Sequence, residues 1–161
     1  MAWAFTEGSS FLRSYPYQQL RSISGIFKRL IPYAAPHDLR IVRVNMRNYH
    51  GSSKFTEAEI SAIADGDAES QAVVIRDLGR QIAAFLEHFG KMHAVPRITE
   101  VDGKAQGGMV LLTWSMGSNL ATSMLGNAVS LPENTKEFLN QYLRTVILLG
   151  KRQMFKGDRL S

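Results

Sequence analysis

The sequence predicts an α/β fold in which short apolar strands alternate with amphipathic helices. Three segments have the apolar, β-branched composition of strands: 39–45, 109–114 and 145–149. The segments between them repeat apolar residues at steps of three and four, the period of a helix with one buried face. This alternation favours a small, mostly parallel sheet of about three to four strands flanked by helices.

The first half of the chain contains clear signals for helix starts and stops. Residues 22–35 form an amphipathic pattern that is expected to end around Pro32. Thr56 and Glu59 have the spacing of a capping box, which predicts a short helix directly after Thr56.

A longer helix is expected from near Asp67 to Phe89, with Gly90 ending it. Residues 92–106 are expected to form a connecting loop. Two further helices are expected after the second strand, over 116–125 and from 133 to about 142.

Composition limits the classes of function. The 161 residues are 45% apolar and contain no cysteine, which excludes disulfides, thiolate chemistry and cysteine-rich zinc sites. The net charge is +5, but Arg40 and Arg43 lie in opposite phase on the first strand, so no nucleic-acid partner is expected. No apolar window is long enough to span a membrane and no signal-peptide profile begins the chain, so a cytoplasmic location is expected.

One domain is therefore expected over 1–161. It comprises an irregular N-terminus, a core and a basic flexible tail, at 1–21, 22–149 and 150–161.

The stretch from Gly107 to Gly126, GGMVLLTWSMGSNLATSMLG, carries the strongest functional signal. It begins with a continuous apolar run that is typical of a strand buried on both faces. Ser115 follows, then Gly117 and a helical segment. A strand, a sharp turn with serine at its apex and a helix together define a nucleophile elbow. Trp114 and Gly117 flank the serine, and Gly117 lets strand and helix approach closely.

A second interpretation of this turn stays open. The usual elbow pattern is G-x-S-x-G, and Thr113 stands here in place of the first glycine. An ordinary strand-to-helix turn, with Ser115 capping the helix N-terminus, fits the same residues.

Three runs of sequence resemble the α/β-hydrolases, and within them a group of fungal α/β-hydrolase-like proteins. The first comprises GIFKRLIPYA and RIVRVNMRNYHGSSKFTEAE, which contains an N-x-R-x-Y-x-G-S pattern. The second is DLGRQIAAFLEHF. The third is GGMVLLTWSMGSNLATSMLG followed by EFLNQYLRTVILL. Together they cover most of residues 25–149, and the N-x-R-x-Y-x-G-S pattern falls on Asn45, Arg47, Tyr49, Gly51 and Ser52.

The resemblance implies a serine hydrolase that acts on a small ester. Ser115 would attack the acyl carbon after losing its proton to a histidine held by an acid. The backbone N–H of Met116 would donate to the developing oxyanion, and the helix that starts there would add its positive end. No cofactor and no metal ion is implied.

The sequence departs from the family pattern in the partners of this serine. All four histidines (His37, His50, His88 and His93) precede Ser115, whereas the family order is serine, acid, histidine. The acids after Ser115 are Glu133, Glu137 and Asp158. The family's internal strand with its His-Gly turn is missing near residues 15–25, and its last strands and lid are absent. A gap in the sheet or a rearranged pairing is expected.

These departures predict a catalytically incomplete member of the family, with Ser115 as the nucleophile-equivalent residue. Two alternatives remain open. One is a non-catalytic interaction protein whose exposed sheet edges associate with another chain, including a second copy of itself. The other is a minimal esterase in which His50, in the loop after the first strand, serves as the base.

Overall fold

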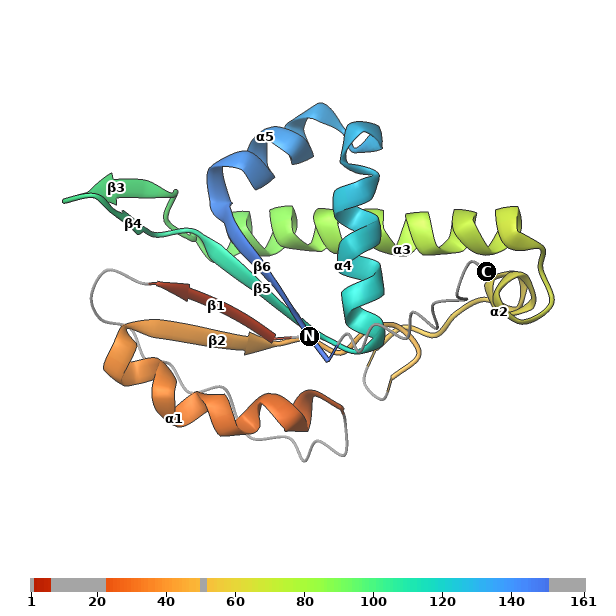
Figure 1. Ribbon diagram of the computed structural model, residues 1–161, viewed down its shortest axis with the longest axis horizontal. Helices are drawn as coiled ribbons and strands as arrows, with labels where there is room; N and C mark the ends of the chain where they lie inside the picture. The colour runs from red at the N-terminus through yellow and green to blue at the C-terminus, as the bar shows by residue number, and fades with distance from the viewer. Residues whose placement is uncertain (1, 7–22, 50–51, 151–161) are drawn as a thin grey trace, which may run out of the picture.

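The computed structural model describes residues 2–6, 23–49 and 52–150 and shows a mixed α/β fold (Figure 1). Its main sheet has four strands in the order β2-β1-β5-β6. Their bounds are Ala2–Thr6 for β1, Leu39–Arg43 for β2, Met109–Trp114 for β5 and Leu143–Leu149 for β6. The three strands predicted from composition, β2, β5 and β6, are thereby confirmed.

The prediction of a mostly parallel sheet is wrong, because β1 lies between β2 and β5 and runs antiparallel to both. Only β5 and β6 pair in parallel. The expected irregular N-terminus over 1–21 is also wrong in part, since residues 2–6 form this inserted strand. Of the two outcomes expected for the missing internal strand, a gap or a rearranged pairing, the sheet has the second. Residue 1 and residues 7–21 lie outside the described residues.

The insertion of β1 leaves β2 and β5 pointing the same way. Ala2 on β1 lies opposite Arg43 on β2 and opposite Leu112 on β5, so the carboxyl ends of β2 and β5 share one edge of the sheet. The two strands are separated by about 10 Å, two strand spacings. The carboxyl end of β6 lies at the same edge, where Trp114 faces Leu149. This side of the sheet, where the carboxyl ends of β2, β5 and β6 lie, is called the elbow edge below. The name refers to the ends of the strands and not to an edge strand.

The first helical segment continues past its expected end. It consists of the 3₁₀ helix η1 (Ile23–Leu30), the short α1 (Ile31–Ala34) and a second 3₁₀ helix η2 (Ala35–His37). Pro32 is the second residue of α1 and does not end the segment. Asp38, at φ 53°, ends the segment instead. In Figure 1 this segment lies below β2, on the opposite side from α3, α4 and α5.

The capping box at Thr56 is confirmed. The Thr56 hydroxyl accepts from the Glu59 N–H, and the Glu59 carboxylate accepts from the Thr56 N–H at 2.7 Å, at the start of α2 (Glu57–Ala64). The long helix α3 (Ala68–Met92) begins at its N-cap Asp67, whose carboxylate accepts from the Ser70 N–H.

Gly90 does not end α3 as expected; the helix continues to Met92. Gly90 is buried, and a Cβ there would lie 2.3 Å from a ring carbon of Phe138 on α5 (Glu133–Tyr142). The glycine therefore makes room for a neighbouring helix rather than terminating its own.

Residues 92–106, expected to be a loop, contain a β-hairpin. Strands β3 (Thr99–Val101) and β4 (Lys104–Gln106) pair antiparallel around Asp102-Gly103. Both turn residues have positive φ, 52° and 70°, as a two-residue type I′ turn requires. The hairpin projects away from the main sheet in Figure 1.

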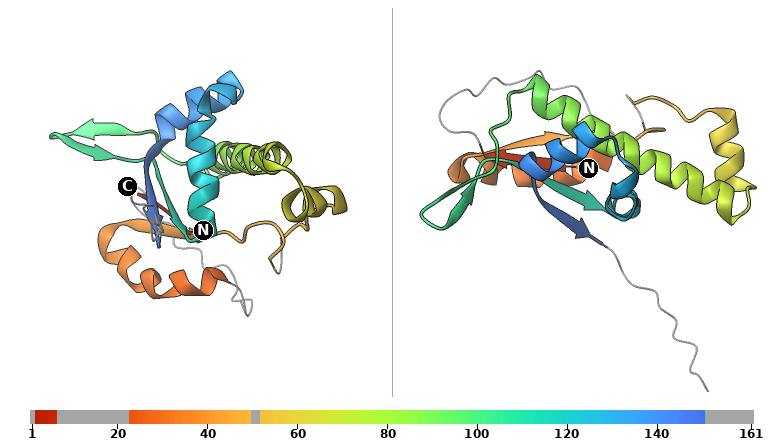
Figure 2. Two further views of the ribbon diagram at one scale, coloured as in Figure 1. Left: turned by 45° about the vertical axis from the view of Figure 1, so that its right-hand side comes forward. Right: turned by 90° about the horizontal axis from the view of Figure 1, so that it is seen from above.

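The core lies between the sheet and the helices α3 and α4 (Met116–Gly126). One side of β5 is fully buried there, through Met109, Leu111 and Thr113. The helices cross closely at Gly79, where a Cβ would lie 2.8 Å from the Met124 nitrogen. In the left view of Figure 2, α3 and α4 lie on the opposite side of the sheet from the α1 segment.

Candidate functional site

The candidate site is the turn between β5 and α4. The strand ends at Trp114, the helix begins at Met116, and Ser115 between them has φ 54° and ψ −122°. A non-glycine residue rarely adopts a positive φ, and this ψ places it outside the left-handed helical region, so the turn is strained. The structure therefore shows the sharp strand-turn-helix arrangement that the sequence predicted. Ser115 does not cap the helix, since its side chain accepts no helix N–H.

The neighbouring strand β6 holds this turn from the side. The Ser115 N–H donates to the Leu149 carbonyl at 3.0 Å, and the Ser118 N–H donates to the Ser115 carbonyl at 2.9 Å. Gly150 follows Leu149 with φ 74°, and a Cβ there would lie 2.8 Å from the Trp114 indole nitrogen. The N–H and the carbonyl of Ser115 are thus both hydrogen-bonded, to β6 and to α4, while the residue itself is exposed.

Thr113, the residue that departs from the elbow pattern, is part of the same support. It is fully buried, and its hydroxyl lies 3.2 Å from the hydroxyl of Ser118, which is also fully buried. The Thr113 hydroxyl donates to the Ile147 carbonyl at 3.3 Å, and the Ser118 hydroxyl donates to the Leu149 carbonyl at 3.3 Å. These two hydroxyls, called the hydroxyl clamp below, join β5, α4 and β6 beneath the turn.

The first turn of α4 has backbone N–H groups without an intrahelical acceptor, and apolar side chains beside Ser115. Met116 and Gly117 occupy the first two helical positions, where a backbone N–H has no intrahelical acceptor. The positive end of the helix dipole lies at the same place. Trp114 is 40% exposed and Met116 50% exposed, whereas Gly117 is buried against the core. An anionic oxygen on an otherwise apolar ligand fits this arrangement chemically.

The described histidines lie away from Ser115. His37 ends η2 directly before β2 begins, at the edge of the sheet opposite the elbow edge. His88 and His93 belong to the end of α3, and the Pro96 carbonyl just beyond them accepts from the Gly108 N–H at the start of β5, again at the opposite edge.

His50, the proposed alternative base, lies outside the described residues. Its described neighbours Tyr49 and Ser52 belong to the loop that follows β2, on the elbow edge.

The acids that follow Ser115 are likewise distant where they are described. Glu133 and Glu137 lie on α5, beyond the far end of α4, which at eleven residues is about 16 Å long. Glu133 pairs with Lys136 at 2.6 Å on the surface of its own helix. Asp158 lies outside the described residues. The structure therefore brings none of the described acids or histidines predicted from sequence to Ser115.

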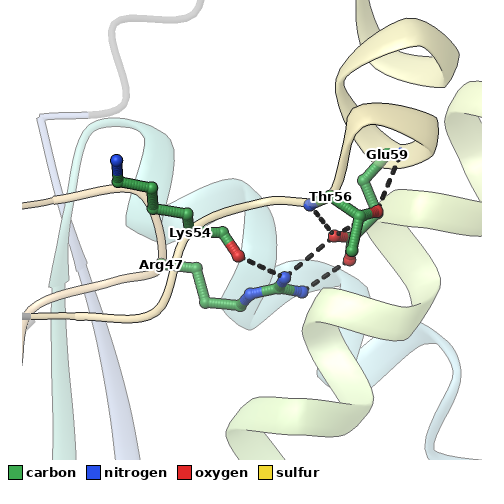
Figure 3. Close-up of polar contacts among 4 residues, drawn as sticks. All are labelled: Arg47, Lys54, Thr56 and Glu59. Carbon is green, nitrogen blue, oxygen red and sulfur yellow. Dashed lines mark hydrogen bonds and ion pairs between the residues drawn. The ribbon is translucent and has the colours of Figure 1, made fainter.

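The loop after β2 is anchored by an ion pair that the sequence analysis did not assign (Figure 3). The Arg47 guanidinium donates to both carboxylate oxygens of Glu59, at 2.5 and 2.8 Å, and to the Lys54 carbonyl at 2.8 Å. It also lies 5.0 Å from the centre of the Phe55 ring. Arg47 and Glu59 thereby fix the loop to the first turn of α2.

The hydrogen bonds from Arg47, followed by the Thr56 N–H, lower the pKa of Glu59 from 4.5 to about 2. Arg47 fills the arginine position of the N-x-R-x-Y-x-G-S pattern, and three of its N–H groups donate within this anchor. The geometry therefore gives it a structural part rather than a catalytic one.

A second polar cluster connects α3 to α5. The buried Glu87 carboxylate accepts from Lys91 at 2.6 Å, from Thr135 at 2.5 Å and from Asn134 at 2.8 Å. These hydrogen bonds, that of Lys91 first, lower the pKa of Glu87. Its partners satisfy both oxygens, which makes the cluster an interhelical tie.

Comparisons with known proteins add no further assignment. Searches against protein-family models, curated proteins and solved structures found no match to this chain. Within residues 2–6, 23–49 and 52–150, no helix is long and apolar enough to cross a membrane. In the same residues no three histidine, aspartate or glutamate side chains cluster as metal ligands would. The cytoplasmic location and the absence of a nucleic-acid partner stay predictions.

Proposed function

We propose that the chain is a serine-hydrolase-like protein of the α/β-hydrolase type, with Ser115 in the position of the nucleophile. The observation that carries the proposal is the strained backbone of Ser115, φ 54° and ψ −122°, between a buried strand and a helix. Such strain is retained where the surrounding structure enforces it, and it is concentrated at functional sites. An ordinary capped turn would need no such conformation.

The chemistry that this position supports is acyl transfer from a small ester. The Ser115 hydroxyl would add to the ester carbonyl, and the leaving alcohol would depart as the acyl-serine forms. The N–H of Met116, the first residue of α4, would donate to the oxyanion, with the dipole of the helix behind it. One such donor contributes about 10²- to 10³-fold in rate.

The described histidines lie away from Ser115, as do Glu133 and Glu137, which supports a slow, catalytically incomplete site. A triad acts as a unit, and its loss leaves only the contribution of the oxyanion hole and of binding. We therefore expect ester hydrolysis that depends on Ser115 but is several orders of magnitude slower than in an enzyme with a complete triad.

A fluorophosphonate probe followed by peptide mass spectrometry tests this proposal. Slow modification of Ser115 in the folded protein, lost in Ser115→Ala and after denaturation, is the expected result. Ser130→Ala is a matched control, because Ser130 is exposed and its hydroxyl donates to the Asn127 carbonyl away from the turn. Labelling spread evenly over exposed serines would contradict the proposal, since Ser115 would then have no special reactivity.

The same experiment separates the minimal-esterase alternative. The loop that carries His50 follows β2 at the elbow edge, which is the specific observation in its favour. Rapid labelling of Ser115 that falls at least tenfold in His50→Gln would establish His50 as the base. Labelling that His50→Gln leaves unchanged would exclude it.

A further inference from the structure

Four apolar side chains adjoin one another on the face of the sheet that is turned away from α3 and α4. Side chains alternate along a strand, so Leu112 and Trp114 of β5 lie on the face opposite the buried Thr113. The pairing of β5 with β6 places Ile147 beside Leu112, and it places Leu149 beside Trp114. Leu112 is half-buried, and the other three are 40–41% exposed. These four residues, Leu112, Trp114, Ile147 and Leu149, are called the apolar strip below.

The helical segment on this side of the sheet covers a different strand. The α1 segment packs against β2 and lies below it in Figure 1. In the sheet order, β1 separates β2 from β5 and β6. At the far end of the apolar strip the exposed Thr145 lies beside Val110, so a hydroxyl follows the apolar side chains. The strip is therefore uncharged, open to solvent and limited in length.

The apolar strip begins at the candidate nucleophile. Trp114 directly precedes Ser115, and the Leu149 carbonyl accepts from the Ser115 N–H at 3.0 Å. Met116, which follows the serine, is 50% exposed. Apolar and aromatic side chains beside a few polar donors are the composition of a small-molecule site. The strip and the turn thus form one continuous surface, with the Ser115 hydroxyl at one end.

The indole of Trp114 is held against the backbone that follows β6. A Cβ on Gly150 would lie 2.8 Å from the indole nitrogen and 2.9 Å from the neighbouring ring carbon Cδ1. The same Cβ would lie 3.8 Å from the Ser115 nitrogen, so the indole packs close to the turn. A large, rigid aromatic side chain offers apolar contact area at a low cost in conformational entropy. Trp114 is therefore suited to bind an apolar chain beside Ser115.

The size of the apolar strip fits an alkyl chain better than a protein partner. Two strands about 4.8 Å apart and a step of two residues along each give a surface on the order of 100 Å². A stable protein interface buries about 800 Å² on each partner. From Ser115 back to the level of Leu112 the distance is about 10 Å, which an extended acyl chain of about eight carbons covers.

We propose that the substrates of Ser115 are esters of linear fatty acids of about eight carbons, with the acyl chain lying along the apolar strip. The proposal rests on Ser115 being the nucleophile, as proposed above. The Ser115 oxygen bonds to the ester carbonyl carbon, and the alcohol leaves with the serine proton. Water then cleaves the acyl-serine, which releases the fatty acid and restores the hydroxyl. The acyl group stays bonded to Ser115 between the two steps, so its contacts with the strip act in both.

Hydrolysis of p-nitrophenyl octanoate and p-nitrophenyl acetate tests the chain-length preference, with the rate of Ser115→Ala subtracted. The wild-type kcat/KM should be at least about tenfold higher for the octanoate, because each methylene that leaves water favours binding. Ile147→Thr keeps a β-branched side chain but removes apolar surface at the far end of the strip. It should lower the octanoate-to-acetate ratio by about threefold. The ratio does not depend on how much of each variant is folded.

Val129→Thr is the matched control for Ile147→Thr. Val129 is 91% exposed and lies in the 3₁₀ helix η3 (Ala128–Ser130), beyond the far end of α4. The same type of substitution there should leave the octanoate-to-acetate ratio at the wild-type value. A wild-type ratio near one would overturn the proposal. A ratio that Ile147→Thr and Val129→Thr change equally would overturn it as well.

Binding to the unreactive Ser115→Ala chain tests the apolar strip without catalysis. The chain contains two tryptophans, so a ¹⁵N NMR spectrum has two indole N–H signals, and Trp114→Phe assigns that of Trp114. Octanamide should shift the Trp114 signal with saturation, whereas acetamide at the same concentration should not. No shift with octanamide, or equal shifts with both amides, would overturn the strip as the acyl site.

The two experiments separate this proposal from the one on which it rests. Ester hydrolysis that requires Ser115 but shows neither a chain-length preference nor an octanamide shift would overturn the acyl site and leave the nucleophile in place. An octanamide shift at Trp114 without any reaction of Ser115 would have the opposite meaning. The strip would then bind alkyl chains, and Ser115 would not be a nucleophile.

Discussion

The two faces of the sheet differ in how they are covered. On the face toward α3 and α4, Met109, Leu111 and Thr113 of β5 are at most 1% exposed. On the other face Val110 and Leu112 of the same strand are only half-buried, and Trp114 is 40% exposed. We call these the closed face and the open face. Residues of one strand, alternating in sequence, thus meet two different environments.

The difference continues onto β6. Val146 packs against the core on the closed face, where it lies beside Leu111. Ile147 and Leu149 lie on the open face and are 40–41% exposed. The stability of the sheet should therefore come mainly from the closed face, while the open face and the edge of β6 retain apolar surface for contact with other molecules.

The largest expected change in the free energy of unfolding is found by comparing alanine substitutions at two adjacent leucines of β5. Leu111→Ala removes a fully buried side chain in contact with the helices and should lower the free energy of unfolding by about 3–5 kcal/mol. Leu112→Ala, one residue on and half-buried, should lower it by about 1–2 kcal/mol. Urea denaturation followed by circular dichroism measures both. Equal losses would show that the open face packs as tightly as the closed face and would contradict the comparison.

Sequence pattern predicted the closed face better than the rest of the molecule. On α3, the buried residues include Leu78, Ile82 and Leu86 at steps of four, which is the period from which the helix was predicted. For β5, the unbroken apolar run suggested burial on both faces. A run without alternation cannot show that one face is only half covered.

The errors arose where long-range contacts overruled local signals. Gly90 has the local features of a helix end, but its role is to admit the ring of Phe138, 48 residues away. The direction of β1 depends on its pairing with β2 and β5, which no local pattern encodes. The β3–β4 hairpin is different, because Asp102-Gly103 is a strong hairpin signal that could have predicted it.

At the candidate site, the sequence predicted the turn but not what supports it. Thr113 counted against the elbow pattern, yet it is half of the hydroxyl clamp with Ser118. Five residues separate the two in sequence, and their acceptors lie on β6, more than thirty residues further on. Only the packed sheet brings these groups together.

A second comparison of the two faces removes a threonine hydroxyl from each, at Thr113 in the hydroxyl clamp and at Thr145 on β6. Thr113→Val keeps the shape of the side chain but removes a buried hydroxyl that donates to the Ile147 carbonyl. It should cost about 1–3 kcal/mol. Thr145→Val on β6 is the matched control, because Thr145 is exposed and its hydroxyl bonds only its neighbour's carbonyl. It should change stability by less than about 0.5 kcal/mol. A Thr113→Val chain as stable as the control would show that the clamp is not needed.

The smallest expected change in stability concerns the attachment of α2. This helix has no buried residue and is held to the loop after β2 by polar contacts. Because Arg47 and the Thr56 N–H lower the pKa of Glu59 from 4.5 to about 2, the folded chain holds this carboxylate ionised where the unfolded chain protonates it. The stability that the pair contributes is therefore complete above pH 4.5 and is lost as the pH falls from about 4.5 to 2. Thermal unfolding measured from pH 6 to pH 2.5 should show the wild-type chain losing more stability than Glu59→Gln over this range.

The other acids with lowered pKa values, Asp67 and Glu87, titrate in both chains and cancel in the difference. Arg47→Met should reduce the pH dependence in the same way as Glu59→Gln, since it removes the group that keeps the carboxylate ionised. Parallel curves for the three chains would mean that α2 does not depend on this pair. In that case its attachment would have to come from the half-buried contacts of Phe55 and Ala62 with the core, and α2 would resemble the open face in its packing.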